Sequence, residues 1–355
     1  MANKKIIVVL VILCMVLGVA FAAGQKETGV TGKSGRPVIR VGSMAYYLSV
    51  PLQVIMDEKL DEKYGFELQI IDFPSGGPMA EALGAGQWDI GPIGAGGMIA
   101  IPNYNAKLIA DVESEMDGAW IIARPDSKIV KAGKTLAKYP DIIGSAEALK
   151  GQTLLGTVGN ISHYMAIDYV SKFGLAMSDV NFIHMETAQV YTAFTAGNGD
   201  IACIGSPAAG QKLLAEGNVL IGGLKQQGNS QQDAILVSDD FYTNHYDLCV
   251  TFMKAWYTAT TKLNADSEYE VAMAKKFYTT SGRTDVSDSA VREECSWNTY
   301  VDLHNINNQK PVGTWMSNLI QTYVEAGTME KSVIDALKNN IRLDVSNDAI
   351  AALSK

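Results

Sequence analysis

The stretch ALGAGQWDIGPIG (82–94) is matched 111 positions later by AFTAGNGDIACIG (193–205). Seven of the thirteen aligned positions are identical, in order and without a gap. The identical pairs are Ala82/Ala193, Ala85/Ala196, Gly86/Gly197, Asp89/Asp200, Ile90/Ile201, Ile93/Ile204 and Gly94/Gly205. In both copies a helix end, a glycine turn and a short apolar strand follow one another. Whether this records a duplication or two generic units with the same turn requirements, it predicts two similar α/β lobes.

Alternating strand and helix signals extend outward from the first copy, and the same order restarts after residue 152. Strands are predicted at 37–44, 66–73, 88–94, 106–114 and 118–127, and helices at 50–65 and 77–86. Such alternation is typical of parallel-rich sheets flanked by helices. We therefore predict an α/β protein with a first lobe at 37–125 and a second lobe at 126–228.

The last third of the chain, residues 229–355, is predicted to return to the first lobe. The segment DAILVS (233–238) is typical of a strand added to the first sheet. The segments that follow, from HYDLCVTFMKAWYTATTKL (245–263) onward, have apolar residues at helical spacing and little glycine before their ends. We expect them to form helices that pack on the first lobe.

The N-terminus has the three parts of a secretory signal peptide. Lys4 and Lys5 precede an apolar run at 6–19, and an A-x-A cleavage pattern lies at 20–22. We predict that residues 1–23 are a signal peptide, that 24–36 are a flexible leader, and that the protein is exported to the periplasm. Two alternatives stay open. Residues 6–23 are about long enough to anchor the chain in a membrane, and Cys14 could be lipidated, although the preceding Leu13 is bulky for such a signal.

Composition and charge narrow the function. The chain has 29 basic and 38 acidic residues, a formal net charge of −9, and no basic stripe, so nucleic acid is not an expected partner. There is no CxxC motif, and the four histidines are scattered, so we expect no metal site and no cofactor. Cys203 is expected in the core, whereas Cys249 and Cys295 could form a disulfide that their spacing alone cannot decide.

Four stretches, in this order, resemble the periplasmic substrate-binding proteins of ABC importers. They are IRVGSMAYYLSVPLQVIMDEKL (39–60), GFELQIIDFPSGGPMAEALGAGQWDIGPIGAGG (65–97), LKGQTLLGTVGNISHYMAIDYVSKFGL (149–175) and AFTAGNGDIACIG (193–205). Within that family the chain resembles the nitrate/sulfonate/taurine class, which includes binders of thiamine-precursor pyrimidines. The resemblance implies a type II-like, two-lobed monomer that closes on a small solute and delivers it to an ABC permease in the inner membrane.

The internal repeat assigns the cleft residues, because ligands of open α/β sheets lie beyond the carboxyl ends of the strands. Aligned strand ends place Ser43 opposite Thr157, the turn at 75–76 opposite 186–187, and the turn at 94–96 opposite 205–206. The predicted ligand-binding residues are Ser43, Tyr46, Tyr47, Ser75, Gly76, Gly77, Gly96, Thr157, Asn160, Ser162, His163, Glu186, Thr187 and Ser206. The glycines would bring backbone N–H groups at helix N-termini close to a polar ligand group, or would only permit tight packing.

Side-chain chemistry within this set suggests the kind of solute. Tyr46 or Tyr47 is expected to cover an apolar or planar ligand, and His163 to donate a hydrogen bond to an anion or stack on a ring. Asn160 and Ser162 are both candidate N-caps, which leaves one of them available for another role.

Glu186 lies among these positions without a basic partner, which favours a ligand with an amine or a ring N–H over a bare anion. A structural alternative is that the Glu186 carboxylate serves the dipole of the following helix. We therefore expect a sulfonate, a taurine-like zwitterion or a pyrimidine-like heterocycle.

Two other functions on the same fold are an enzyme of the pyrimidine-precursor type and a sensor input domain. Against the enzyme, Ser206 has no histidine partner at a recognisable spacing, and the iron motif of the pyrimidine-synthase branch is missing from the sequence. Against the sensor, the sequence ends at AIAALSK without a signalling module. We therefore predict a solute receptor and not an enzyme.

Overall fold

The computed structural model describes residues 31–115, 118–284 and 286–355. The predicted signal peptide, its two alternatives and most of the leader lie outside these residues. The chain divides into two compact units, Met1–Val38 and Ile39–Lys355. In the described part of the first unit, Thr31 forms an antiparallel bridge with Pro37.

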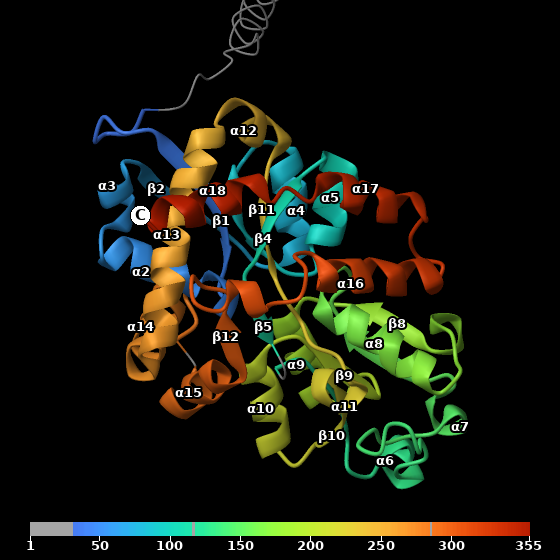
Figure 1. The fold of residues 1–355 in the computed structure, drawn as a ribbon. Coiled ribbons are helices and arrows are strands. Elements are labelled where there is room, and N and C mark those ends of the chain that lie inside the picture. Colours follow the sequence, from blue (N-terminus) through green and yellow to red (C-terminus); the bar gives the residue numbers. More distant parts are fainter. Residues whose placement is uncertain (1–30, 116–117, 285) are drawn as a thin grey trace, which may run out of the picture. The chain divides into compact units, whose positions relative to one another are not determined.

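The second unit is built on two five-stranded sheets with matching strand orders, β2-β1-β3-β11-β4 and β8-β7-β9-β6-β10 (Figure 1). The strands of the first sheet are β1 (Val38–Met44), β2 (Glu67–Phe73), β3 (Ile90–Ile93), β4 (Lys107–Asp111) and β11 (Ala234–Val237). Those of the second are β6 (Trp120–Ala123), β7 (Thr153–Gly156), β8 (Asn181–His184), β9 (Ile201–Ile204) and β10 (Val219–Gly223). The α/β prediction, with two similar sheets, is confirmed.

The fourth strand of each sheet comes from the other half of the sequence. β11 runs antiparallel between β3 and β4, and β6 runs antiparallel between β9 and β10. The chain thus crosses between the sheets twice, once before β6 and once before β11. β6 lies inside the range 37–125 that the sequence assigned to the first lobe, so the second sheet begins earlier than predicted. A local apolar pattern identifies a strand but not the strand with which it pairs.

Helices flank both sheets, and a helical C-terminal region follows β11. The early helices are α2 (Val50–Asp57), α3 (Leu60–Tyr64), α4 (Gly76–Gly84), α5 (Gly97–Tyr104), α6 (Lys128–Ala132), α7 (Ala146–Leu149), α8 (Ile161–Lys172), α9 (Thr187–Thr195), α10 (Pro207–Ala215) and α11 (Leu224–Gln227). The later helices are α12 (Asp239–Asn244), α13 (Tyr246–Ala265), α14 (Ser267–Thr280), α15 (Asp288–Trp297), α16 (Thr314–Glu325), α17 (Ser332–Asn340) and α18 (Asp344–Leu353). Three 3₁₀ turns are η1 (Tyr47–Ser49), η2 (Met177–Asp179) and η3 (Ile306–Asn308).

The sequence predicted that the C-terminal helices pack on the first lobe, and this prediction is wrong for two of them. α13 and α14 contact α2, but α15 contacts α10, and α16 contacts α8 of the second lobe. A third, two-stranded sheet pairs β12 (Asn298–Tyr300) with β5 (Glu113–Glu115), which lies on the first crossing segment. The C-terminal region therefore touches both lobes and one of the crossings between them.

The residues shared by the two sequence copies make the same contacts in both sheets. The Asp89 carboxylate accepts a hydrogen bond from the Arg40 backbone N–H at 2.9 Å, and the Asp200 carboxylate accepts one from the Thr153 N–H at 2.8 Å. Gly86 and Gly197 end α4 and α9 with positive φ angles, 68° and 90°, which favour glycine. These shared residues therefore encode strand clamps and helix ends.

A second pair of equivalent contacts lies where the first strand of each sheet ends. The Met44 N–H donates to the Ser49 hydroxyl at 3.2 Å, and the Thr157 N–H donates to the Ser162 hydroxyl at 3.0 Å. In each case a serine five residues downstream holds the turn that leads into a helix.

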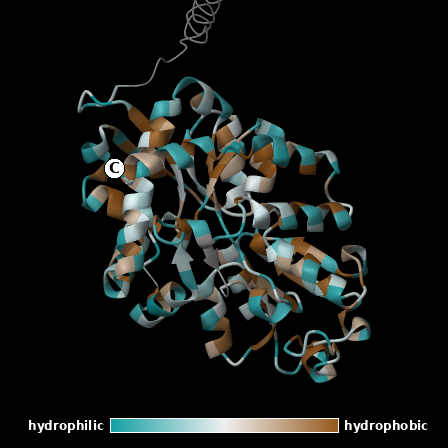
Figure 2. Cartoon of the chain, in the orientation of Figure 1, coloured by the Kyte–Doolittle hydropathy of each residue, from teal (hydrophilic) through white to brown (hydrophobic). Residues whose placement is uncertain are grey.

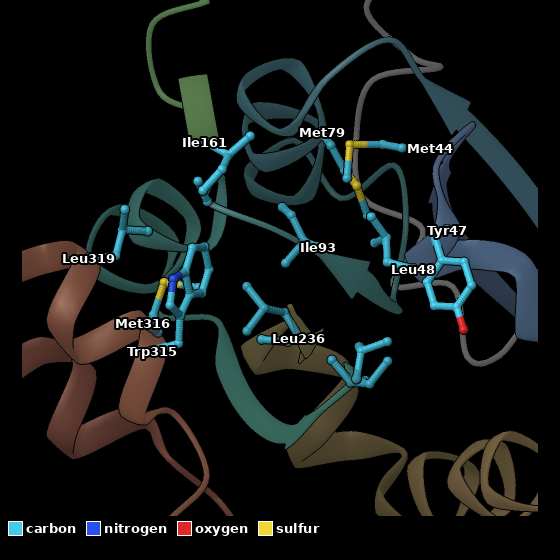
Figure 3. Close-up of a cluster of buried hydrophobic side chains, with 14 of the residues drawn as sticks. Met44, Tyr47, Leu48, Met79, Ile93, Ile161, Leu236, Trp315, Met316 and Leu319 are labelled. Atoms are coloured by element: carbon cyan, nitrogen blue, oxygen red, sulfur yellow. The ribbon is translucent and has the colours of Figure 1, made fainter. Parts of the chain in front are cut away.

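Buried apolar side chains form a hydrophobic core, and Figure 2 shows hydrophobic residues along the strands and helices of the chain. Figure 3 shows Ile93 of β3 between Met79 of α4 and Leu236 of β11, with side chains of α16 packed beside them. Trp88 is fully buried, and its indole N–H donates to the Met79 carbonyl at 2.8 Å. Burying a large apolar side chain contributes roughly 1.5–3 kcal/mol, so this core holds the turns at the strand ends in place.

The three described cysteines are free and buried. The possible disulfide between Cys249 and Cys295 is therefore not formed. Cys249 belongs to α13 and Cys295 to α15, and both are core residues of their helices, as is typical of a buried thiol.

Candidate functional site

A cavity of about 70 Å³ lies beyond the carboxyl ends of strands from both sheets. The first half of the chain contributes Met44, Tyr46, Tyr47, Leu48, Ser75, Gly76, Gly94, Ala95 and Gly96. The second lobe contributes Asn160, Ile161, Gly205 and Pro207. The crossing segments add Glu113, Ala119, Gln231 and Asp233, and α15 adds Glu294. This is the place where open α/β sheets bind ligands, and here the cavity is lined by both lobes.

Six of the predicted residues line this cavity: Tyr46, Tyr47, Ser75, Gly76, Gly96 and Asn160. Ser75 is the N-cap residue of α4, and Asn160 is the N-cap residue of α8. The Asn160 side chain caps its helix by accepting the Ser162 N–H at 2.9 Å. No capping bond of this kind is formed by Ser75, so its hydroxyl is not committed to the helix.

Two more predicted residues, Thr187 and Ser206, line an adjoining outer pocket of about 510 Å³. Tyr46 borders both spaces and separates the inner cavity from the outer pocket. The outer pocket also contains Arg283, whose guanidinium donates to the Ala45 carbonyl at 2.7 Å and lies over the Tyr46 ring. Burial raises the pKa of the Tyr46 hydroxyl, and Arg283 opposes that shift.

The remaining predicted residues do not line the inner cavity: Ser43, Gly77, Thr157, Ser162, His163 and Glu186. Ser162 is buried and holds the turn at Thr157, whose own hydroxyl donates to the Met185 carbonyl at 2.8 Å. His163 packs against Phe182 and Tyr323, with ring centroids 4.7 and 5.2 Å away. Burial lowers its pKa to about 4, which keeps the imidazole neutral.

Glu186 occupies the position that the structural alternative requires, at the N-terminus of the following helix, but its side chain forms no capping hydrogen bond. It is the N-cap residue of α9, and its backbone N–H donates to the Gln189 side chain at 3.2 Å. Its carboxylate therefore lies at a helix N-terminus and not among the residues that line the cavity.

Three carboxyl groups that the sequence analysis missed do line the cavity. Glu113, Asp233 and Glu294 are 2%, 2% and 4% exposed. Glu113 and Asp233 lie on the two crossing segments, which are joined by a bond from the Val112 N–H to the Asp233 carbonyl at 2.8 Å. The available sequence signal was the polar run QQD (231–233) directly before a buried strand. Glu294 gave no signal, since it lies within an ordinary amphipathic helix.

Gly94 is small because an acid lies against it. A Cβ atom at Gly94 would lie 2.8 Å from Asp233 Oδ1, and one at Gly96 would lie 2.3 Å from the Gly76 carbonyl oxygen. The glycine-rich turn thus admits the Asp233 side chain and lets two helix N-termini meet. A larger residue at Gly94 or Gly96 would therefore change the shape of the cavity.

The carboxyl groups of Glu113 and Asp233 lie close enough to each other for Glu113 to affect the pKa of Asp233. Burial raises the pKa of Asp233, while its bonds to Glu113 and to Gln231 oppose the shift. Burial also raises the pKa of Glu294, and the Arg283 guanidinium opposes it. Among the described residues, no Lys, Arg or His lines the cavity, so its interior is acidic.

Tyr47 is fixed from behind by the C-terminal region. Its hydroxyl donates to Glu270, its ring stacks on Tyr300 at 4.6 Å, and its carbonyl accepts the Tyr300 hydroxyl at 2.8 Å. Burial raises the pKa of Glu270 to about 7. One wall of the cavity is thereby coupled to α14 and β12.

Two further properties concern metals and membranes. Within 31–115, 118–284 and 286–355, no group of three or more His, Cys, Asp or Glu side chains is arranged to hold a metal ion. No helix in this described part of the chain is long and apolar enough to cross a membrane.

Solved structures share this architecture and define the class. The alkanesulfonate-binding protein SsuA of Xanthomonas axonopodis pv. citri, bound to MOPS, superposes with a TM-score of 0.67 at 17% identity, over 86% of this chain and 98% of that one. The periplasmic nitrate-binding protein NrtA of Synechocystis PCC 6803 gives 0.69 at 14% identity, over 89% of each chain. The fold is that of the periplasmic binding proteins.

The family follows from sequence. Residues 32–278 match the model of the NMT1-like family. A protein of Brachyspira hyodysenteriae named as an ABC transporter periplasmic binding protein is 33% identical over 306 residues, which cover 86% of this chain and 87% of the relative. The chain belongs to the NMT1-like family.

Proposed function

We propose that the protein is the extracytoplasmic solute-binding component of an ABC importer, and that it captures a small organic solute in the cavity between its lobes. The observation that carries this proposal is that both lobes and both crossing segments line one cavity. Family membership and the similarity to the Brachyspira binding protein support it. A solute of this kind would be handed to a permease in the inner membrane by a monomer in the periplasm.

Closure of the lobes would provide the binding mechanism. The two crossing segments link the sheets covalently and also line the cavity. They are hydrogen-bonded to each other through the Val112 N–H and the Asp233 carbonyl. A solute that contacts residues of both lobes only when they approach stabilises the closed form by its differential affinity. The permease would then recognise the closed form.

The cavity sets the size of the solute. Since one water molecule needs roughly 10–15 Å³ on this measure, about 70 Å³ holds roughly five waters or a solute of similar bulk. Of the expected solutes, a plain sulfonate would face buried carboxyl groups without a basic counter-charge. A taurine-like zwitterion or an amino-substituted heterocycle fits the acidic interior better.

Catalysis on the same fold is less well supported. None of the three described cysteines lines the cavity, and burial raises the pKa of Cys203, Cys249 and Cys295, which suppresses the nucleophilic thiolate. We therefore propose a binding protein and not an enzyme.

Thermal denaturation of the purified protein with taurine, ethanesulfonate, nitrate, 4-aminopyrimidine and ethanolamine tests the proposal. A solute at 100 times its Kd adds about 2.7 kcal/mol and raises Tm by several degrees. Substituting Ile161 by Trp would enlarge a side chain that lines the cavity and should abolish the response. A response that survives in that variant would place binding elsewhere and overturn the proposed site.

A further inference from the structure

The inner cavity offers hydrogen-bond acceptors at one end. Gln231 is 7% exposed, and its amide nitrogen donates to Asp233 Oδ1 at 2.5 Å. With the amide nitrogen donating to Asp233, Oε1 of Gln231 is directed away from Asp233. Within the described residues Gln231 Oε1 has no hydrogen-bond partner. A buried carbonyl oxygen of this kind costs roughly 1–3 kcal/mol unless something donates to it.

The charges around this acceptor are negative. Asp233 accepts the bond from Gln231, Glu113 interacts with Asp233, and Glu294 reaches the cavity from α15. Arg283 lines the outer pocket and not the inner cavity, although its guanidinium opposes the effect of burial on the pKa of Glu294. An anion entering the inner cavity would meet buried carboxyl groups, whereas a cation would neutralise them.

The other walls suit carbon atoms. Met44, Leu48 and Ile161 are apolar, and the rings of Tyr46 and Tyr47 flank the space. Aromatic faces attract organic cations, and apolar walls contact their carbon skeleton, whereas a hydrated inorganic ion would gain little from either.

We propose that the solute is a small organic cation, an ammonium, amidinium or guanidinium compound, whose N–H groups donate to Gln231 Oε1 and to the carboxyl groups of Asp233 and Glu294. This inference rests on the proposed function and names its substrate class. Because Asp233 and Gln231 lie on a crossing segment, the cation binds at the segment about which the lobes close. An alternative role for the acids is to neutralise the helix N-termini around the cavity, which would require no cationic ligand.

The test is isothermal titration of the purified protein with ammonium, amidinium and guanidinium compounds of roughly four to eight non-hydrogen atoms. Ethanesulfonate and methylphosphonate serve as matched anions, and pyrimidine as a neutral heterocycle. We expect saturable binding of at least one cation and none of the anions. Binding of an anion or of pyrimidine with no cation bound would overturn the inference but leave the proposed function intact. Binding of none of these compounds would count against both.

Variants locate the binding groups. Asp233→Asn keeps the bond from Gln231 and should weaken cation binding by about tenfold to a hundredfold, and Gln231→Met by about tenfold. Glu293→Gln is the matched control for Glu294→Gln, because Glu293 is its exposed neighbour on α15. Unchanged cation affinity in Asp233→Asn, Gln231→Met and Glu294→Gln, each shown to be folded by circular dichroism, would overturn the inference.

Discussion

The two sheets share a strand order, a strand clamp and a serine-held turn, yet they contribute very differently to the cavity. The turn at 75–76 of the first lobe lines the inner cavity, whereas the aligned turn at 186–187 of the second lobe does not. The carboxyl groups belong to neither repeated turn, since they lie on the crossing segments and on α15. The repeated segments therefore build the two sheets, and the segments outside the repeat provide the carboxyl groups that line the cavity.

The largest expected effect on the free energy of unfolding comes from Asp111, which has no acidic counterpart in the second sheet. It lies at the end of β4, where the aligned end of β10 is Gly223, and it is 4% exposed. Both of its carboxylate oxygens accept the Gly313 N–H, at 3.1 and 3.2 Å. Burial raises its pKa from 3.8 to about 7, against the Gly313 bond and with a further rise from Asp233.

For Asp111 the folded pKa is above the unfolded one, so its contribution is favourable below about pH 4 and is lost as the pH rises through about 7. The shift corresponds to roughly 4 kcal/mol at most. We expect Asp111→Asn, compared with wild type, to gain stability progressively between pH 4 and pH 8. Urea denaturation across this range measures it, with the exposed Asp126→Asn as control. A difference between wild type and Asp111→Asn that does not change with pH would contradict the assignment.

The strand clamps provide a matched pair. Asp89 accepts the Arg40 backbone N–H and also forms an ion pair with its guanidinium, whereas Asp200 accepts the Thr153 N–H. We expect Asp89→Ala to cost about 3 kcal/mol and Asp200→Ala about 1–2 kcal/mol, because the first leaves a backbone N–H and a cation without their partner. Chemical denaturation of both variants compares them directly. Equal losses would mean that the ion pair adds nothing.

The acids near the cavity form the next comparison. Glu294→Gln should weaken solute binding about tenfold, and Glu186→Gln should leave it unchanged, because of these two glutamates only Glu294 lines the cavity. Titration with the tightest-binding solute measures both. A larger loss in Glu186→Gln would return the binding role to the second repeated turn.

The smallest effect separates two N-cap residues. Asn160→Ala should destabilise the protein by about 1 kcal/mol, because the Asn160 side chain caps α8. Ser75→Ala should cost less than about 0.5 kcal/mol, since the Ser75 hydroxyl forms no capping bond in α4. Thermal denaturation without solute distinguishes the two.

Local signals in the sequence were enough for the architecture. Glycine turns, strand alternation and the repeat at 82–94 and 193–205 predicted two α/β sheets, because turn chemistry and apolar periodicity act within a few residues. The place of β6 in the second sheet was not predictable in this way. Its apolar run WIIA (120–123) fits either sheet, and long-range strand pairing decides between them.

The site was predicted less well for the same reason. Strand-end residues such as Ser75 and Asn160 follow from the rule for α/β sheets, and they do line the cavity. Glu113, Asp233 and Glu294 are far apart in sequence and meet only because the chain crosses twice and α15 folds back. The sequence attached the preference for an amine-bearing solute to Glu186, and we now propose it on Gln231, Asp233 and Glu294.

Closure about the crossing segments can be measured as a distance between the lobes. Spin labels on cysteines replacing the exposed Glu81 of α4 and Glu147 of α7 would report it, since the native described cysteines are buried. Adding the tightest-binding organic cation should shorten the distance and narrow its distribution, and Asp233→Asn should shift that response to higher concentration. An unchanged distance at a concentration where calorimetry shows saturated binding would contradict capture by lobe closure.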